Sequence, residues 1–376
     1  MANSVQILDA IRSGKNRLSR KDLHVATGIS WGTVYRTIDM LIADGLVAER
    51  KEGPSGRGRP NIPISLVPGA AYFLGVDIGA CQTKLVLCDH AFNIAVKLCV
   101  PTPRYSGEEP FWDWLEAIIG DGLSRRSFPR EKLRGVGLSV SGNVDSENSV
   151  IVSGGNFGLK WGADLPVSRL AQRCGISVRA ITTSAAAVWG EYWFGEFAGC
   201  ANLVTVGLGA GIGSGAVSGG QLLISQPRRP IGYIGHMLMP DNPRVCVCGY
   251  RGCLESYSGG NSLALIAAER RPTARSAAEL DAAAAAGDAV AQEILLKAAS
   301  YNAVGVASMI QLYSPEAVVF AGGQSREDGF LYQHTIEALL GILPHERRQT
   351  FTISLTRLGE YQSAMGAARL AYEKFL

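Results

Sequence analysis

Hydrophobic residues recur at helical spacing along the first part of the chain, where the pattern predicts three short helices. Val5, Leu8 and Ile11 place apolar side chains on one face of a first helix. A second helix is expected at residues 19–26, followed by a glycine-containing turn at residues 27–29. These segments predict a small helical unit at the start of the chain.

The third helix is expected to begin after Ser30, whose hydroxyl suits the N-cap position. Its apolar residues, spaced i, i+4, i+7 and i+8, form one stripe: Val34, Ile38, Leu41 and Ile42. The other faces carry Trp31, Thr33, Tyr35, Arg36 and Thr37. Recognition helices contact DNA base edges with residues near their N-termini. We therefore predict that the DNA-contacting residues of this helix are Ser30, Trp31, Thr33, Tyr35 and Arg36.

A segment rich in glycine and arginine follows this helix and separates two predicted strands. The second strand has alternating apolar residues at Ile62, Ile64 and Leu66. The connecting segment contains the sequence GRGRP, which includes Arg57 and Arg59. Guanidinium groups on a flexible backbone suit phosphates or a narrow minor groove. Arg57 and Arg59 are therefore predicted to bind DNA as part of a wing.

Charge is unevenly distributed along the sequence. The first 70 residues contain ten Lys and Arg and six Asp and Glu, whereas the remaining residues contain 26 and 27. A basic unit before a nearly neutral body suits nucleic acid at one end and a small neutral ligand at the other. We expect residues 1–70 to form a winged helix-turn-helix DNA-binding domain. A three-helix unit that serves in protein contacts is the alternative.

The composition is that of an ordinary globular protein: 376 residues, of which 47% are hydrophobic and 18% charged, enough for two or three domains. The apolar segments are interrupted by polar residues and are too short to cross a bilayer. The N-terminus lacks the basic and apolar stretches of a secretory signal. Because the cysteines are clustered rather than spread as a disulfide framework, we expect a cytoplasmic protein without a membrane partner.

The cluster of cysteines has the spacing of a metal site. His236, Cys246, Cys248 and Cys253 follow the pattern H-x9-C-x-C-x4-C in a segment rich in glycine and proline. Four soft donors suit tetrahedral zinc, and four protein ligands make a closed, structural site. Ordinary buried cysteines are the alternative. A bound zinc ion would also fix the position of Glu255, which lies two residues after the last cysteine.

The metal segment, with its pattern GH…CxCGxxGCLE, resembles the signature of the ROK family, named for repressors, open reading frames and sugar kinases. The family includes enzymes that phosphorylate hexoses and repressors that sense them. The resemblance implies an α/β fold for residues 71–376, with two lobes similar to the actin-like ATPase fold of sugar kinases. Further matching segments are GVDIGACQTKLVLCD from Gly75, GVGLSVSGNVD from Gly135, GLGAGIGSG from Gly207, VVFAGG from Val318 and GAARLA from Gly366.

Glycine-rich turns resemble the ATP-binding turns of kinases with this fold. Strands are expected at residues 72–77 and 84–88, joined by a turn whose backbone amides hold phosphates in those kinases. Residues 207–215 resemble the second phosphate loop, and residues 321–323 resemble the turn near the adenosine. The alternative is that these glycines serve only the bends of the fold.

The catalytic position of the resemblance is altered. ROK kinases carry Asn-Asp before a helix of small residues, and the Asp is the general base. In this sequence Thr182 and Thr183 stand in those places, and Ala210 stands where kinases commonly have Thr. A threonine hydroxyl is too weak a base at neutral pH to replace the Asp. Phosphoryl transfer is therefore not expected.

The sugar-binding residues of the family are only partly present. Tyr233 replaces the sugar-binding Glu three residues before the zinc-binding His, whereas His236 and Glu255 are retained. Asn156 and Trp161 resemble the loop that closes over the sugar. Such a pocket would suit a stacked pyranose. The predicted carbohydrate-binding residues are Asn156, Thr182, Thr183, Tyr233, His236 and Glu255.

We therefore predict a repressor of carbohydrate-utilisation genes that carries structural zinc and binds double-stranded operator DNA as a homodimer or a dimer of dimers. A carbohydrate effector between the lobes would change the separation of the two recognition helices. Two alternatives stay open: a ROK hexose kinase with an added DNA-binding domain, and a DNA-binding regulator with a vestigial sugar site.

Overall fold

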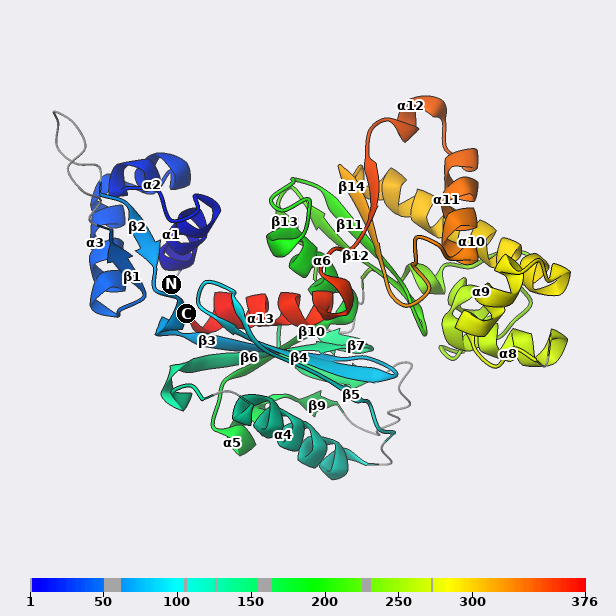
Figure 1. The fold of residues 1–376 in the computed structure, drawn as a ribbon, viewed down its shortest axis with the longest axis horizontal. Coiled ribbons are helices and arrows are strands. Elements are labelled where there is room, and N and C mark those ends of the chain that lie inside the picture. Colours follow the sequence, from blue (N-terminus) through cyan, green and yellow to red (C-terminus); the bar gives the residue numbers. More distant parts are fainter. Residues whose placement is uncertain are drawn as a thin grey trace.

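The computed structural model describes residues 2–50, 62–104, 107–125, 127–153, 164–224, 231–271 and 273–376. Figure 1 shows a small helical unit that contains the N-terminus, followed by two α/β lobes. The helical unit consists of α1 (Ala2–Ser13), α2 (Arg20–Thr27), α3 (Trp31–Ala43) and the antiparallel strands β1 (Val47–Glu49) and β2 (Ile64–Leu66).

Local sequence explains how the helices of this unit begin and end. Ser19 and Asp22 form a capping box at the start of α2: the Ser19 N–H donates to the Asp22 carboxylate over 3.0 Å, and the Asp22 N–H donates to the Ser19 hydroxyl over 3.3 Å. Gly28 ends α2 with a left-handed φ of 68°. On α3, Thr37 is buried, and our assignment of this residue to an outer face was wrong. It lies three residues after Val34, so it widens the buried stripe.

The first lobe is built on a five-stranded sheet in the order β10-β6-β3-β4-β5. Alternate side chains of β3 point to opposite faces of the sheet. Leu74 and Val76 belong to the apolar cluster that contains α4, and Phe73 belongs to the cluster that contains α13. Figure 1 shows α4 and α5 on one side of this sheet and α13 on the other. The elements are β3 (Tyr72–Ile78), β4 (Gln82–Asp89), β5 (Ile94–Pro101), α4 (Glu108–Ser124), β6 (Leu133–Val140), α5 (Ser168–Cys174), β10 (Val178–Thr182) and α13 (Gln362–Phe375), with a small sheet of β7 (Asn143–Asp145), β8 (Val150–Ser153) and β9 (Leu165–Pro166).

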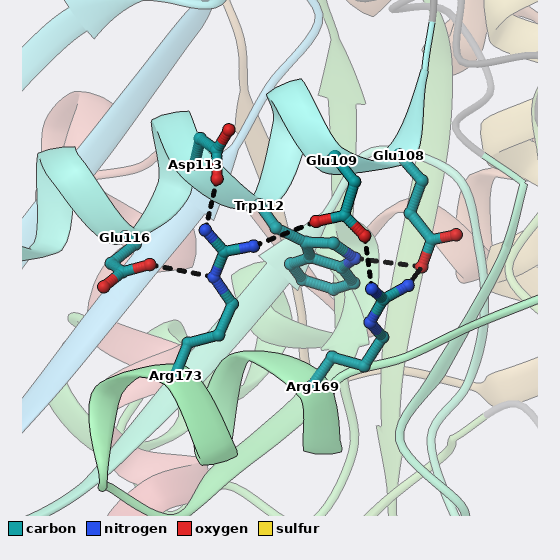
Figure 2. A network of polar contacts seen from close by, with 7 residues as sticks. All are labelled: Glu108, Glu109, Trp112, Asp113, Glu116, Arg169 and Arg173. Atoms are coloured by element: carbon teal, nitrogen blue, oxygen red, sulfur yellow. Dashed lines mark hydrogen bonds and ion pairs between the residues drawn. The ribbon is translucent and has the colours of Figure 1, made fainter.

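A charged network joins α4 to α5 on the outer side of this lobe (Figure 2). Arg169 of α5 pairs with two glutamates of α4, and Arg173 pairs with three carboxylates. These groups are partly exposed, so each pair contributes little by itself, but two arginines shared among four acids hold α5 in one position. Because α5 precedes β10, this network supports the strand that leads into the site described below. Its members are Glu108, Glu109, Trp112, Asp113, Glu116, Arg169 and Arg173.

The second lobe has a five-stranded sheet in the order β13-β12-β11-β14-β15, and its main apolar cluster lies between this sheet and the helices α8 to α11. Its elements are β11 (Leu203–Leu208), β12 (Ile212–Ser218), β13 (Gln221–Leu222), α7 (Glu255–Ser258), α8 (Gly260–Arg270), α9 (Ala277–Ala285), α10 (Ala289–Tyr313), β14 (Ala317–Ala321), α11 (Phe330–Ile342), α12 (His345–Arg348) and β15 (Thr352–Leu355). Short 3-10 helices are η1 (Pro68–Ala70), η2 (Arg130–Lys132), η4 (Ile234–His236) and η5 (Gly359–Tyr361).

Two helices connect the lobes. α6 (Thr183–Phe194) follows β10 directly and packs against β11 and β12 of the second lobe and against α13. Glycines allow α6 and α13 to pack closely together. A side chain at Gly190 would meet the Gln362 carbonyl, and one at Gly366 would meet the Ala186 carbonyl. The backbones of α6 and α13 are therefore in contact. Among the described residues, no helix has the length and apolar character required to cross a membrane.

Candidate functional site

Four soft ligand atoms converge in the segment between η4 and α7. His236, Cys246, Cys248 and Cys253 each bring one ligand atom to within 4.8 Å of the other three. The Cys246 sulfur lies 3.7 Å from His236 Nδ1, and the Cys248 and Cys253 sulfurs lie 3.6 Å apart. Around tetrahedral zinc with ordinary bond lengths, neighbouring ligand atoms are about 3.6–3.8 Å apart. The donor set and its spacing therefore fit a zinc ion.

Backbone contacts hold this segment in shape. The Cys246 N–H donates to the Tyr250 carbonyl over 2.7 Å, and the Gly252 N–H donates to the Arg244 carbonyl over 2.9 Å. Gly249 and Gly252 have φ angles of 94° and 93°. Residues with a side chain rarely adopt these values, so the two glycines allow the chain to reverse between the cysteines.

Burial, reinforced by the neighbouring thiols, raises the pKa of the Cys253 thiol to about 12. Burial also raises the pKa of Cys246. Both thiols would keep their protons at neutral pH unless a cation took the place of those protons. The segment is therefore suited to a metal, whose charge would offset the cost of two buried thiolates.

Glu255 is the first residue of α7 and is buried. Its Oε2 atom accepts a hydrogen bond of 2.6 Å from the Ile212 N–H at the start of β12. Gly235 allows η4 to approach closely, because a side chain at this position would lie 3.2 Å from Glu255 Cβ and also meet the Ile212 carbonyl. The carboxylate is therefore fixed between β12, η4 and the metal segment.

Tyr233 and His236 lie at the two ends of η4, with ring centroids 5.5 Å apart and planes almost perpendicular. The Tyr233 hydroxyl donates to the Gly142 carbonyl of the first lobe over 3.2 Å, which links the two lobes directly. Burial, together with the nearby Glu255 carboxylate, raises the pKa of Tyr233 to about 12. The hydroxyl therefore remains a neutral hydrogen-bond donor at physiological pH.

Thr182 and Thr183 stand at the start of α6, where the two lobes meet. The Thr182 hydroxyl caps the helix by accepting from the Ala185 N–H over 3.3 Å. The Thr183 hydroxyl instead donates to Asp77 over 3.3 Å. Thr182 also lines a small cavity with Ser214, Gly232, Met309 and Tyr313. The two threonines thus differ in role: one supports the helix, and the other points to a buried acid.

Asp77, at the end of β3, was missed in our sequence reasoning. It accepts a 2.7 Å hydrogen bond from Ser139 in addition to that from Thr183. Burial raises its pKa, although Ser139 and the nearby Lys84 act in the opposite direction. β3, β6 and β10 run parallel, so the residues at their carboxyl ends meet at one edge of the sheet. The order of the strands in the sheet places these residues side by side, so their spacing along the chain carried no signal for the contact.

The glycine-rich turns are packed against each other. The expected loop at residues 207–215 is mostly strand, since β11 ends at Leu208 and β12 begins at Ile212. The Gly209 carbonyl accepts from the Gly260 N–H (2.9 Å) and the Gln324 side chain (2.7 Å). A side chain at Gly215 would meet the Ser184 carbonyl, and one at Gly322 would meet the Leu208 carbonyl, so close approach of backbones accounts for these two glycines.

The outer surface of α3 carries an aromatic pair. The rings of Trp31 and Tyr35 are 4.8 Å apart, and 44% and 38% of these residues remain exposed. The Arg20 guanidinium lies 4.7 Å from the Tyr35 ring and is paired with Asp39 and Glu49. Arg20 therefore orients Tyr35 rather than offering a free charge.

The remaining expected residues of α3 lie close to Trp31 and Tyr35. Arg36 is exposed. Within the described part of the chain, its side chain donates only to the Gly32 carbonyl of the same helix, over 3.3 Å. Ser30 and Thr33 are joined through their hydroxyls, 2.8 Å apart. All five predicted residues of this helix thus occupy its N-terminal half. Arg57, Arg59, Asn156 and Trp161 lie outside the described residues.

Residues 73–374 match the ROK family. The chain belongs to this family. The match begins just after the helical unit and ends two residues before the C-terminus, so it covers both lobes.

The chain is similar both to repressors and to sugar kinases. A xylose repressor of Bacillus subtilis is 22% identical over 96% of this chain and 92% of its own length. A glucokinase of Thermotoga maritima is 29% identical over 80% of this chain and 97% of its own length. Among solved structures, a ROK family transcriptional regulator described as a homolog of the E. coli MLC protein superposes with a TM-score of 0.79, covering 98% of this chain and 96% of its own at 20% identity. That structure supports the fold.

Proposed function

We propose that the chain is a DNA-binding transcriptional regulator, acting as a repressor, with a winged helix-turn-helix domain at residues 1–70 and a sugar-sensing domain at residues 71–376. One observation carries this proposal: the helical unit precedes the part of the chain that matches the family. The glucokinase is matched along 97% of its length yet covers 80% of this chain. The xylose repressor covers 96%, which leaves almost no part of the chain without a counterpart.

The ligand of the sensing domain is proposed to be a carbohydrate, bound between the lobes by the group that we call the interlobe site: Thr183, Tyr233, His236 and Glu255. This group offers two hydroxyls, an imidazole and a carboxylate beside an aromatic ring, which suits the hydroxyls and the apolar face of a pyranose. Thr182 would donate a hydrogen bond to the carbohydrate through its hydroxyl proton. Asn156, which lies outside the described residues, is also proposed to bind the carbohydrate.

The cluster of His236 and three cysteines is proposed to hold a structural zinc ion. All four positions of a tetrahedral ion would be filled by protein atoms, so the metal would stabilise the segment and would not bind substrate. Its chemical contribution would be to fix the His236 ring and the start of α7, and thereby Glu255.

Kinase activity is not proposed, because Thr183 stands in the position of the family's general base. The second candidate function, a hexose kinase, is favoured by one observation: the Asp77 carboxylate lies 3.3 Å from the Thr183 hydroxyl. A coupled assay of ATP consumption with glucose, xylose and N-acetylmannosamine tests it. Sugar-dependent turnover that Asp77→Asn abolishes would favour the kinase over the regulator.

The regulator is proposed to act in the cytoplasm as a homodimer or a dimer of dimers on double-stranded operator DNA with two half-sites. Selection from a random-sequence DNA library, followed by footprinting, tests this directly. We expect enrichment of an inverted repeat whose half-sites are spaced by about one helical turn or a multiple of it. Enrichment of no sequence would refute the proposal. A panel of pentoses, hexoses and disaccharides added to the selected complex then tests whether a sugar releases the DNA.

A further inference from the structure

A buried ion network joins the helical unit to the C-terminal helix. Arg369 of α13 is 1% exposed and forms two parallel 2.6 Å hydrogen bonds with the Asp9 carboxylate of α1. Its Nε–H donates to Glu373 over 2.9 Å. Arg12 also donates to Asp9 over 2.6 Å. Two arginines and two carboxylates thus balance in charge at the place where α1 meets α13, which we call the junction.

Aromatic rings from α6 and α13 surround these charges. The Arg12 and Arg369 guanidinium groups each lie 4.8 Å from the Tyr372 ring. Arg369 also lies 3.6 Å from the ring of Trp193 near the end of α6. Such contacts favour a cation held over an aromatic face, and they weaken quickly with displacement. The end of α6 is therefore part of the junction.

The helical unit shares its core with the first lobe. Ile7, Leu8 and Ile11 of α1 belong to one apolar cluster with Phe73 of β3 and Tyr372 of α13. Apolar contacts alone tolerate sliding, whereas a bidentate Arg–carboxylate pair has one preferred geometry. A buried ion pair is also costly to desolvate, so it is weak evidence for stability. The bidentate contact between Asp9 and Arg369 restricts the orientation of α1 on α13.

The other end of α6 lies at the interlobe site. The helix has 12 residues and is about 18 Å long, with Thr183 first and Trp193 and Phe194 last. Its position against α13 is fixed by the backbone contacts at Gly190 and by a 2.9 Å hydrogen bond from the Gln362 side chain to buried Glu191. Because α6 is held against α13, a displacement at Thr183 would move the two helices together, including the aromatic end of α6 at the junction.

We propose that α6, α13 and the Asp9–Arg369 pair form the device that couples the interlobe site to the orientation of the helical unit. The inference rests on the proposed function for its biological use: closure of the lobes on a ligand would rotate the recognition helices of a dimer relative to each other. The helices form a continuous path of packed residues from the interlobe site to the junction, but such a path does not by itself show that the two are energetically coupled. The test therefore measures how a change at the interlobe site affects the helical unit.

Hydrogen–deuterium exchange of the 376-residue chain, measured without DNA or ligand, provides that test. Asp9→Asn removes one charge of the pair and preserves its shape. We expect amides of α1 and of η1 to exchange at least about tenfold faster in this variant, while β3 and β6 remain as protected as in the wild type. Glu196→Gln is the matched control, because Glu196 follows α6 and forms an exposed ion pair with Arg357 over 2.7 Å. The control should leave exchange in α1 unchanged.

Coupling is measured by perturbing the interlobe site. Tyr233→Phe removes the hydrogen bond between the lobes, and we expect it to change exchange in α1 by about threefold or more in the wild-type background. In the Asp9→Asn background the same substitution should have no effect on α1. An equal effect of Tyr233→Phe in both backgrounds, or unchanged exchange in Asp9→Asn, would overturn the proposal.

Arg369→Lys is the second variant, since an ammonium group keeps the charge but cannot form the bidentate pair. It should reproduce the Asp9→Asn pattern. If both variants instead lose protection throughout β3 and β6, the pair holds the body together and the proposal is overturned. The outcome is independent of DNA: a protein that selects no operator but shows the expected exchange pattern refutes the proposed function and leaves the coupling device supported.

Discussion

The Thr183 hydroxyl donates a 3.3 Å hydrogen bond to the Asp77 carboxylate, although the two residues lie 106 positions apart in the sequence. Thr183 is the first residue of α6, and Asp77 is near the end of β3. The pair places a buried acid beside Thr183, a residue of the proposed interlobe site. The ionisation of Asp77 therefore bears on the hydrogen bonding at the start of α6.

The first prediction concerns the pH dependence of stability. Burial raises the pKa of Asp77 in the folded protein, so its contribution to stability is present below the unfolded pKa and is lost as pH rises through the folded pKa. Asp77→Asn is neutral at every pH. The Tm difference between variant and wild type, measured by calorimetry from pH 4 to pH 8, should therefore shift in favour of the variant as pH rises.

Asp288→Asn is the control for this experiment, because the pKa of Asp288 is shifted in the opposite direction to that of Asp77. The Ala291 N–H, followed by Arg271, lowers the pKa of Asp288, so the wild-type carboxylate stabilises the protein above its unfolded pKa. Asp288→Asn should become more destabilising as pH rises. Equal pH profiles for the two variants would contradict the assignment of a raised pKa to Asp77.

The second prediction concerns metal content. Purified protein should contain about one zinc ion per chain, and Cys246→Ser should lose it. The Tm should fall by about 5 °C or more, because each kcal/mol lost shifts the Tm of a domain of this size by roughly 2–4 °C. Elemental analysis and calorimetry measure both effects. Cys99→Ser, an exposed cysteine on β5, should change neither. A metal-free protein with full stability would rule out the structural role.

The third prediction separates base contacts from phosphate contacts. Arg36→Ala should cost roughly 1–3 kcal/mol of operator affinity and relax specificity at one base position. The double change Arg57→Ala and Arg59→Ala should weaken binding to all sequences and reduce the salt slope by about one unit for each lost phosphate contact. Fluorescence anisotropy at several salt concentrations distinguishes the two.

Arg125→Ala is the control for the DNA measurements, because this exposed arginine of the body pairs with Asp121 on α4. It should leave operator affinity and salt slope unchanged. An Arg36→Ala variant that binds the selected operator as tightly as the wild type would show that α3 docks in another way.

The fourth prediction concerns the effector. Glu255→Gln keeps an oxygen that can accept from the Ile212 N–H, whereas Glu255→Ala would leave that buried donor without its partner at a cost of about 1–3 kcal/mol. Effector affinity should fall more than about tenfold in Glu255→Gln, since charge-assisted bonds to sugar hydroxyls are lost. Operator affinity without effector should stay near the wild-type value.

Reciprocity completes this test. Operator DNA must change effector affinity by the same factor by which effector changes operator affinity. Calorimetric titration of the sugars that release the DNA, with and without operator, measures both factors. Sugar binding that is indifferent to operator would show that the interlobe site is no sensor.

Local features were predictable from the sequence because their causes are local. The metal ligands lie within 18 positions, and hydrogen bonds and glycine turns of the same segment bring their ligand atoms within 4.8 Å of one another. The helices of the N-terminal unit follow from apolar periodicity, a capping box at Ser19 and the left-handed conformation of Gly28. Family membership likewise follows from motifs that are continuous in the chain.

The tertiary structure alone decided which distant residues share an environment. Parallel strands bring Asp77, Ser139 and Thr183 together at one edge of a sheet, and no spacing along the chain encodes that contact. Asp9 and Arg369 meet across 360 positions because an apolar cluster docks α1 onto α13. The physical reason is the same in both cases: side chains become neighbours through packing of whole elements, which depends on the combined burial of many apolar residues rather than on any local pattern.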